Sequence, residues 1–316
     1  MRFLILSFTI LIFSCNQMPQ PPIEGDSQNQ FGIVIHGGAG TLLRSDMTPE
    51  MDATYRQLLQ EAVTTGHAIL ASGGSSTEAV EKTIHVMENS PLFNAGKGAV
   101  LNAEGEIELD ASFMDGARLD AGAIAGARLI KNPISAAIAV MNNSPHVMLS
   151  STGADRFAET QGLAMEAPDY FVTERRVQSL QRVQEEESST QANIQQKSPF
   201  YQQQRFGTVG CVALDQAGNL AAGTSTGGMT NKKWNRIGDA PIIGAGTYAN
   251  NASCGISATG WGEYFIRSVV AHDIAALVEY KGLSIQEAAR LVIHEKVAKL
   301  GGDGGVVGLD RNGNVA

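Results

Sequence analysis

The spacing of apolar residues divides the chain into predicted strands and predicted helices. Short apolar runs bounded by Gly, Asn, Asp or Pro are typical of strands. The first half of the chain has a strand that breaks into a glycine-rich turn within 32–40, a pair at 107–116 and 121–129, and a short strand at 146–149. The second half has strands at 208–215, 219–226, 241–249 and 253–260.

Capping residues mark where the predicted helices begin. Thr48 as N-cap and Pro49 at the first helical position begin a helix that ends at Gly73. Ser75 and Glu78 have the spacing of a capping box and begin the next helix. Shorter helices are expected at 132–143 and 153–162.

Two further helices are predicted near the C-terminus. One spans 263–281, and another begins at Ser284, where Glu287 completes a capping box, and stops at Gly301. The residues that share the apolar face of the first are Ile266, Val269, Val270, Ile274 and Leu277.

Residues 172 to about 206 are charged and rich in Gln, with almost no aliphatic periodicity. This composition is typical of a segment that does not join a packed core, so it predicts a mobile linker. The periodic segments on both sides of the linker predict one domain over 31–316.

The order of the elements predicts the fold class. Strands followed by helices, twice along the chain, predict two sheets stacked face to face with helices outside, a four-layer αββα sandwich of the α+β class. Segments 211–222 and 306–316 repeat the order strand, Asp, turn, Gly-Asn, strand, and predict two similar hairpins. The sequence ends at Ala316 within the second hairpin, which favours a longer natural chain.

Composition limits the function classes. The chain has 316 residues, of which 43% are hydrophobic, enough for a sizeable core. The 35 glycines predict many tight turns. A formal net charge of −9, without a long Lys or Arg cluster, argues against a nucleic-acid partner. A small-molecule or peptide substrate is therefore expected.

The N-terminus has the pattern of an export signal: Arg2 precedes a short apolar run that ends at Phe13. The segment IFSC resembles a bacterial lipobox, which predicts a signal peptide at 1–14, lipidation of Cys15 and a flexible tether at 15–30. The protein is then expected to be exported and anchored in the bacterial periplasm or at the outer membrane, with no other membrane contact. The alternative is a plain secretory signal with an incidental cysteine.

Three other candidate groups receive structural interpretations. Cys211 and Cys254 lie within apolar strand patterns with no ligand residue at metal-binding spacing, so buried thiols are expected. The HGGAG segment lacks the spacing of a dinucleotide or P-loop motif. Its glycines allow a close backbone approach, and His36 is interpreted as a core histidine.

The bond between Gly207 and Thr208 lies where the linker meets a central strand. Thr208 Oγ can attack the Gly207 carbonyl, exchange the amide for an ester and let water release the upstream chain. The new N-terminal threonine then carries a nucleophile and, in its α-amine, a base. Alone, a Gly-Thr pair at a strand start is more often ordinary structure.

The surrounding residues resemble the plant-type asparaginase and isoaspartyl peptidase family, which belongs to the N-terminal-nucleophile hydrolases. The matching motifs are IHGGAGT, SPLFNAGKGAVLNAEGEIELDASFMDG and the specific block from 207 to 263. The likeness extends over nearly all of the chain from Gly32 onward except the linker.

The resemblance implies roles for the residues that match these motifs. Thr208 is the expected nucleophile in self-cleavage and in turnover, Thr226 its hydroxyl partner, and Asn94 a residue near its amine. Thr259 and the Gly260 amide match the oxyanion hole, whose donors meet charge that develops in the transition state.

Arg236 and Asp239 have the chemistry to bind an amino acid. Arginine offers a bidentate fork to the α-carboxylate, and aspartate pairs with the α-ammonium. The resemblance places both in the substrate pocket, with backbone contacts from Gly228 and Gly262; the alternative is a surface ion pair. Trp234 departs from the family pattern and is expected to alter the rim of the pocket.

The family resemblance also implies a loop that holds a structural sodium ion, while no cofactor is required for the reaction. The backbone ligands expected for sodium are Met87, Glu88, Ser90, Phe93, Ala95 and Lys97.

The resemblance implies an amidohydrolase that cleaves β-aspartyl (isoaspartyl) dipeptides and L-asparagine after self-cleavage into an α chain (15–207) and a β chain (208–316), which assemble as an (αβ)2 heterotetramer. Two alternatives remain open. One is glycosylasparaginase, which shares the amino-acid recognition, and the other is a lipid-anchored amino-acid-binding protein that never matures.

Overall fold

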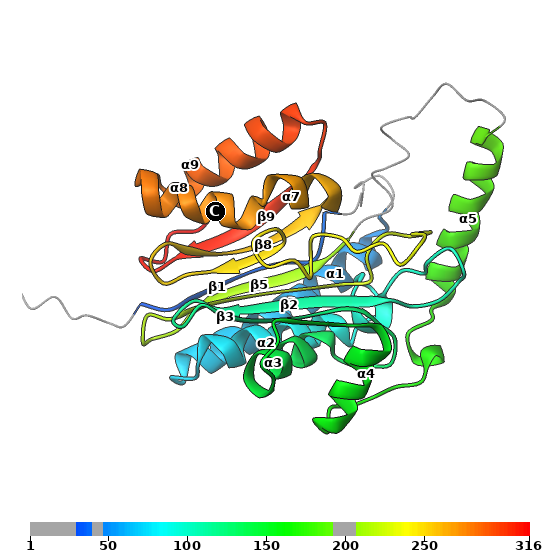
Figure 1. Cartoon of the computed structure of the whole chain (residues 1–316), viewed down its shortest axis with the longest axis horizontal. Helices are drawn as coiled ribbons and strands as arrows, with labels where there is room; N and C mark the ends of the chain where they lie inside the picture. Colours follow the sequence, from blue (N-terminus) through cyan, green and yellow to red (C-terminus); the bar gives the residue numbers. More distant parts are fainter. Residues whose placement is uncertain (1–29, 40–46, 192–206) are drawn as a thin grey trace, which may run out of the picture.

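The computed structural model describes residues 30–39, 47–191 and 207–316 (Figure 1). The predicted signal peptide, Cys15, nearly all of the tether and the end of the predicted linker lie outside the described residues. Within the described part of the chain, no helix is long and apolar enough to cross a membrane.

The larger of two sheets has six strands in the order β1-β5-β6-β2-β3-β4. All neighbours are antiparallel except β3 and β4, which are parallel. The predicted hairpin of β5 and β6 and the predicted pairing of β2 with β3 are confirmed. The strands are β1 (Gly32–His36), β2 (Leu109–Asp115), β3 (Asp120–Ala127), β4 (Met148–Ser150), β5 (Val209–Leu214) and β6 (Leu220–Thr226).

The smaller sheet has the order β7-β8-β9, with both pairs antiparallel. The second predicted hairpin is confirmed, because Gly308 and Ala316 exchange backbone hydrogen bonds of 2.8 and 3.0 Å. The strand predicted at 241–249 is shorter than expected, since turns occupy its first residues and only the end pairs. The strands are β7 (Thr247–Ala249), β8 (Cys254–Gly260) and β9 (Gly304–Asp310).

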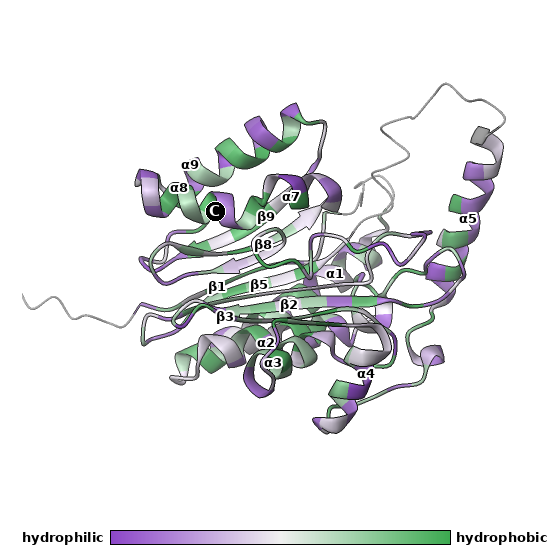
Figure 2. Cartoon of the chain, viewed as in Figure 1, coloured by the Kyte–Doolittle hydropathy of each residue, from purple (hydrophilic) through white to green (hydrophobic). Residues whose placement is uncertain are grey.

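Helices cover the outer faces of both sheets, so that the two sheets face each other (Figure 1). Helices α2 and α3 pack on the larger sheet, α1 packs on α2 and β1, and α8 and α9 pack on the smaller sheet. Figure 2 shows the strands of the larger sheet in mostly hydrophobic colours. The helices are α1 (Pro49–Ala71), α2 (Ser76–Glu88), α3 (Pro133–Asn143), α4 (Ser151–Thr160), α5 (Glu174–Gln191), α7 (Gly262–Ser268), α8 (Val270–Lys281) and α9 (Ile285–Arg290).

Short helical segments complete the described secondary structure. Two are 3-10 turns, η2 (Gly96–Gly98) and η3 (Pro168–Tyr170), and the third is a π-helical continuation of α9, η4 (Leu291–Val297).

The capping predictions are confirmed at Thr48 and Ser284, and in part at Ser75, where the Glu78 amide donates to the Ser75 hydroxyl without the return bond of the predicted capping box. The side chain of Thr48 accepts a hydrogen bond at the start of α1, and Ser75 does the same at the start of α2. The capping box of Ser284 and Glu287 forms in both directions at α9. Each of these caps depends on residues within one helical turn, which explains why the sequence alone predicts them.

The face of the larger sheet that meets the smaller sheet changes from apolar to polar along the strands. The strand register aligns two neighbouring rows of four residues each across this face, one apolar and one polar. The apolar row is Val34, Val212, Ala222 and Met114, and the polar row is His36, Gly210, Thr224 and Ser112. One step further, Asp110 pairs with Thr226, next to Thr208.

The prediction of a linker without structure is wrong for residues 174–191, which form α5. Leu180 and Val183 are only 7% and 5% exposed, so a narrow apolar stripe fixes a helix that is otherwise charged. Hydrogen bonds from Arg176 to the Gly98 carbonyl (2.6 Å) and from Gln184 to the Ala103 carbonyl (3.0 Å) attach α5 to the loop before β2.

The prediction of a single helix at 263–281 is also wrong, because the helix is interrupted at Val269, which separates α7 from α8. Val269 has φ 49° and is 46% exposed instead of joining the apolar face. The backbone amides of Ala271 and His272 donate to the carbonyls of Ala245 and Gly244. These long-range hydrogen bonds fix the start of α8 in a direction that local periodicity does not reveal.

Candidate active site

The Gly207–Thr208 bond lies immediately before β5, and Thr208 is buried, with 8% exposure. Its Oγ1 lies 2.8 Å from the carbonyl oxygen of Gly207 and 3.1 Å from Oγ1 of Thr226 at the end of β6. The strand pairing of β5 with β6 therefore brings the two predicted threonine hydroxyls together at the predicted cleavage site.

The carbonyl oxygen of Gly207 also receives donors from two other residues. Thr226 Oγ1 lies 2.8 Å from it, and Asn94 Nδ2 lies 2.7 Å from it. A carbonyl held by several donors is polarised, and the same donors stabilise negative charge on its oxygen during nucleophilic attack.

Asn94 lies in the loop after α2, and its side-chain amide is fully used. Nδ2 donates a second hydrogen bond of 2.8 Å to the Gly228 carbonyl, and Oδ1 accepts one of 2.8 Å from the Val100 amide. Asn94 thus joins the loop after α2 to the turn after β6, and both contacts orient Nδ2 toward Gly207.

The turn from Thr226 to Gly228 sets the direction of the hydroxyl protons. The Gly228 amide donates to Thr226 Oγ1 at 3.0 Å, in a turn for which Gly228 adopts φ +83°. Thr226 Oγ1 then accepts from Gly228 and Thr208 and donates its own proton to the Gly207 carbonyl. The hydroxyls of Thr208 and Thr226 each donate their single proton to one acceptor in this arrangement.

Thr259 and Gly260 end β8 and bring the smaller sheet to the site. The Ala39 amide donates to Thr259 Oγ1 at 3.0 Å, which leaves the Thr259 hydroxyl proton free to be donated. Gly38, at φ +114°, lies so close to Thr208 that a Cβ would be 2.9 Å from its backbone nitrogen. The segment after β1 therefore bridges Thr208 and Thr259, as the predicted close backbone approach requires.

Arg236 forms a bidentate ion pair with Glu263, which was not predicted as a site residue. Nε and Nη2 of the guanidinium each lie 2.8 Å from a Glu263 carboxylate oxygen. A Cβ on Gly262 would lie 2.8 Å from Arg236 Nη2 and 2.9 Å from Asp239 Oδ1. Arg236, Asp239 and Gly262 therefore lie close together, as predicted. The only sequence signal for Glu263 was its position directly after Gly262.

Asp239 is 5% exposed, and its Oδ2 has no hydrogen-bond partner among the described residues. Burial raises the pKa of this carboxyl to about 7, although the positive charge of Arg236 opposes the shift. A buried carboxylate oxygen without a partner is costly unless a ligand supplies a donor. The geometry suits a substrate ammonium group.

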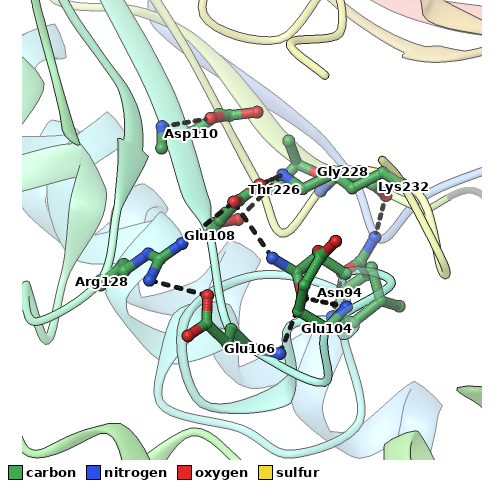
Figure 3. Close-up of polar contacts among 12 residues, drawn as sticks. Asn94, Glu104, Glu106, Glu108, Asp110, Arg128, Thr226, Gly228 and Lys232 are labelled. Carbon is green, nitrogen blue, oxygen red and sulfur yellow. Dashed lines mark hydrogen bonds and ion pairs between the residues drawn. The ribbon is translucent and has the colours of Figure 1, made fainter. Parts of the chain in front are cut away.

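Two buried ionisable side chains near the site were missed by sequence reasoning, which named Glu88 only for its backbone carbonyl. The Lys232 ammonium, 1% exposed, lies 3.3 Å from Oε2 of Glu108 (Figure 3). Glu88 at the end of α2 accepts hydrogen bonds from Ser225 Oγ (2.7 Å) and the Ile134 amide (3.0 Å), and burial raises its pKa to about 7. Neither group has a local sequence partner that would have revealed it.

The interpretation of the two cysteines as buried thiols is confirmed, whereas that of His36 as a satisfied core histidine is confirmed only in part, because His36 is half-buried and its Nδ1 has no hydrogen-bond partner among the described residues. His36 Nε2 lies 3.0 Å from Ser257 Oγ, and burial lowers the pKa of the imidazole to about 4. Cys211 and Cys254 are buried free thiols, and burial raises the pKa of Cys254 to about 12. Trp234 is 93% exposed at φ 55°, and no described contact joins it to the site residues.

The predicted sodium loop runs from the end of α2 to η2. The carbonyl of Glu88 faces Gly96, where a Cβ would collide with it, and that of Phe93 faces Gly98. The carbonyls of Met87 and Ala95 accept from the amides of Ser90 and Gly98. In the described parts of the chain, no three His, Cys, Asp or Glu side chains gather to hold a metal ion.

Comparison with known proteins assigns the chain to a family. A family model described as asparaginase matches residues 29–316, so the chain belongs to the asparaginase family. Among individual proteins, the chain is 47% identical over 288 residues to the isoaspartyl peptidase of Salmonella typhimurium, with 91% of each chain covered. It is 47% identical to the Escherichia coli isoaspartyl peptidase over 284 residues (90% of this chain, 88% of the relative). It is 40% identical to the mouse isoaspartyl peptidase/L-asparaginase over 294 residues (93% and 86%).

Proposed function

We propose that this protein is an isoaspartyl peptidase and L-asparaginase that activates itself by cutting the Gly207–Thr208 bond. The observation that carries the proposal is the 2.8 Å contact between Thr208 Oγ1 and the carbonyl of Gly207, held by Asn94 and Thr226. Membership of the asparaginase family and the names of the relatives support the choice of substrates.

Self-cleavage begins when Thr208 Oγ attacks the Gly207 carbonyl carbon. Asn94 Nδ2 and the Thr226 hydroxyl stabilise the oxyanion. The C–N bond breaks as the proton lost by Oγ passes to the departing nitrogen, and an ester joins Gly207 to Thr208 Oγ. Water hydrolyses this ester, which leaves a carboxylate on Gly207 and a free amine and hydroxyl on Thr208.

In turnover, the free amine of Thr208 takes the Oγ proton and Oγ attacks the side-chain carbonyl of the substrate. The Thr259 hydroxyl and the Gly260 amide stabilise the new oxyanion. The protonated amine then gives its proton to the leaving nitrogen, which departs as ammonia or as an amino acid. Water hydrolyses the β-aspartyl ester by the same route, releases aspartate and restores Thr208.

Substrate recognition uses the paired charges beside the nucleophile. The Arg236 guanidinium binds the α-carboxylate, and the unpartnered Oδ2 of Asp239 accepts from the α-ammonium. The backbone of Gly262 adds contacts from the same side, whereas the Gly228 amide and carbonyl already bind Thr226 and Asn94, so the predicted substrate contact from Gly228 is not part of the proposal. Both asparagine and β-aspartyl dipeptides carry these two charged groups on the aspartyl part, which stays on the enzyme as the ester when the leaving nitrogen departs.

The proposal extends to the assembly and to the loop after α2. The facing sheets with outer helices are assigned to the four-layer αββα sandwich of N-terminal-nucleophile hydrolases, and two cleaved αβ units form the (αβ)2 heterotetramer. The loop from Met87 to Lys97 offers backbone carbonyl oxygens, the ligand type that hard cations take, although those of Met87 and Ala95 already accept backbone hydrogen bonds. A sodium ion held there would stabilise the loop that carries Asn94. Replacing sodium chloride by choline chloride then lowers Tm.

Export and lipid anchoring through Cys15 are also part of the proposal, supported by the pattern of residues 1–15. Mass spectrometry of the mature protein from bacterial membranes tests it, because a diacylglycerol adduct on Cys15 is expected and an unmodified mature chain in the soluble fraction would contradict it.

The function is tested by supplying the protein with three substrates at equal concentration: a β-aspartyl dipeptide, L-asparagine and a glycosyl-asparagine. Release of aspartate from the first two is expected, and none from a Thr208→Ala variant. A clear preference for the glycosyl-asparagine would assign glycosylasparaginase instead. Saturable aspartate binding by an uncut, inactive chain would identify a binding protein.

A further inference from the structure

The Lys232 ammonium lies in the protein interior, next to Gly228 in the turn that follows Thr226. Its side chain is 1% exposed, and a buried ammonium is unfavourable unless other groups compensate it. Its Nζ lies 3.3 Å from both Oε2 and the backbone carbonyl of Glu108, which is 3% exposed. Asp110 is a second buried carboxyl whose pKa the Lys232 charge lowers, against a larger upward shift from burial.

Glu108 is itself held in place by other contacts. Its Oε1 accepts from Asn102 Nδ2 at 3.1 Å and lies 3.4 Å from Arg128 Nη2. The backbone of Lys232 is fixed as well, because its carbonyl accepts from the Ala103 amide at 2.9 Å. The ammonium therefore has a defined position instead of a mobile one (Figure 3).

The other neighbour of the ammonium is Gly228. A Cβ at Gly228 would lie 3.0 Å from Lys232 Nζ and 3.2 Å from its Cδ, so the side chain packs against the Gly228 backbone. On the other side of the same turn, Asn94 Nδ2 binds the Gly228 carbonyl. Gly228 is thus fixed between Asn94 and Lys232, in the position where its amide donates to Thr226 Oγ1.

We propose that Lys232 is a positioning residue for the reaction, and that its buried ammonium, fixed by Glu108, holds Gly228 so that the Gly228 amide orients the Thr226 hydroxyl, which accepts from the nucleophile Thr208 and donates to the Gly207 carbonyl. The proposal rests on the proposed function. Lys232 touches neither the scissile bond nor the substrate groups. It acts through the Gly228 amide, whose hydrogen bond fixes which way the Thr226 proton points.

The role predicts an effect on the chemical steps and little effect on substrate binding, because no hydrogen bond or ion pair of the described residues joins Lys232 to Arg236 or Asp239. Lys232→Met keeps most of the side-chain volume and removes the charge. Self-cleavage and kcat are expected to fall roughly tenfold or more, since small displacements of catalytic groups have effects of this size. KM is expected to stay within about twofold of the wild-type value.

The adjacent Lys233 offers a matched control, because its ammonium is exposed and pairs with Glu187 of α5 at 3.0 Å. Lys233→Met should leave self-cleavage and kcat within about twofold of wild type. The double variant Lys232→Met/Glu108→Met removes the ammonium together with the carboxylate that it contacts, which should recover part of the stability that a single unpaired buried charge costs. It also keeps the test possible if the single variant does not fold.

The experiment measures the half-time of self-cleavage by intact mass, kcat and KM on a β-aspartyl dipeptide, and Tm for the full chain and the three variants. A double variant that regains Tm but stays slow, with unchanged KM, supports the proposal. A double variant as fast as wild type, or a single variant as fast as Lys233→Met, would overturn it. A wild-type chain that neither cuts itself nor hydrolyses the dipeptide would contradict the proposed function instead.

Discussion

Arg236 and Glu263 form a bidentate pair between the turn after β6 and the first turn of α7, with both hydrogen bonds at 2.8 Å. Glu263 occupies Nε and one hydrogen of Nη2, while Nη1 lies beside Gly238, which has no side chain to cover it. The ion pair therefore orients the guanidinium and leaves its Nη1 edge for a second carboxylate.

Arg236→Lys should weaken substrate binding, because a lysine cannot contact Glu263 and a substrate carboxylate with one rigid fork. Loss of a hydrogen bond to a charged group corresponds to about 1.5–3 kcal/mol, or roughly 10- to 150-fold in KM. Steady-state kinetics on L-asparagine measures this, with the exposed Arg118→Lys as control. Unchanged KM in Arg236→Lys would remove Arg236 from the substrate site.

Asp239 should give the pH profile of kcat/KM a rising limb near pH 7. Burial raises the pKa of its carboxyl to about 7, so below this pH the group is protonated and cannot pair with the substrate ammonium. Activity at low substrate should therefore rise with pH through about 7. With a substrate analogue that lacks the α-ammonium, only the limb that the Thr208 amine causes near its ordinary pKa of about 7.7–8.0 should remain; an unchanged limb with this analogue would contradict the assignment of Asp239.

The Glu88 side chain takes no part in the proposed reaction, but it should contribute strongly to the free energy of unfolding. It is fully buried and accepts from Ser225, Asn132 and the Ile134 amide at the start of α3. Glu88→Ala leaves these donors without an acceptor, which should lower the free energy of unfolding by at least about 2 kcal/mol. Urea unfolding of the uncut Thr208→Ala chain measures this without interference from cleavage.

The control for Glu88 is Glu61→Ala on the exposed side of α1, where a change within about 0.5 kcal/mol is expected. Equal effects of the two substitutions would show that the buried contacts of Glu88 contribute nothing to stability.

Features that depend on neighbouring residues could be predicted from the sequence. The caps at Thr48 and Ser284 and the turn of the β5–β6 hairpin depend on contacts within a few residues. The candidate site residues were found because they occur in recognisable motifs, and the structure brings Thr208, Thr226 and Asn94 together at one carbonyl.

Features that depend on distant contacts were missed. Helix α5 has a stripe of few apolar residues in a charged segment, and only its packing shows that Leu180 and Val183 are buried. The break at Val269 follows from hydrogen bonds to residues of the turn before β7. The Lys232–Glu108 pair joins residues 124 positions apart, so no local sequence pattern predicts it.

The central claim is that Thr208 becomes the N-terminal nucleophile, and intact mass with N-terminal sequencing after incubation of the purified chain tests it most directly. Two fragments are predicted, with the shorter beginning at Thr208, and a Thr208→Ala chain should stay uncut. A wild-type chain that remains whole, or a Thr208→Ala chain that is still cut at this bond, would contradict the claim.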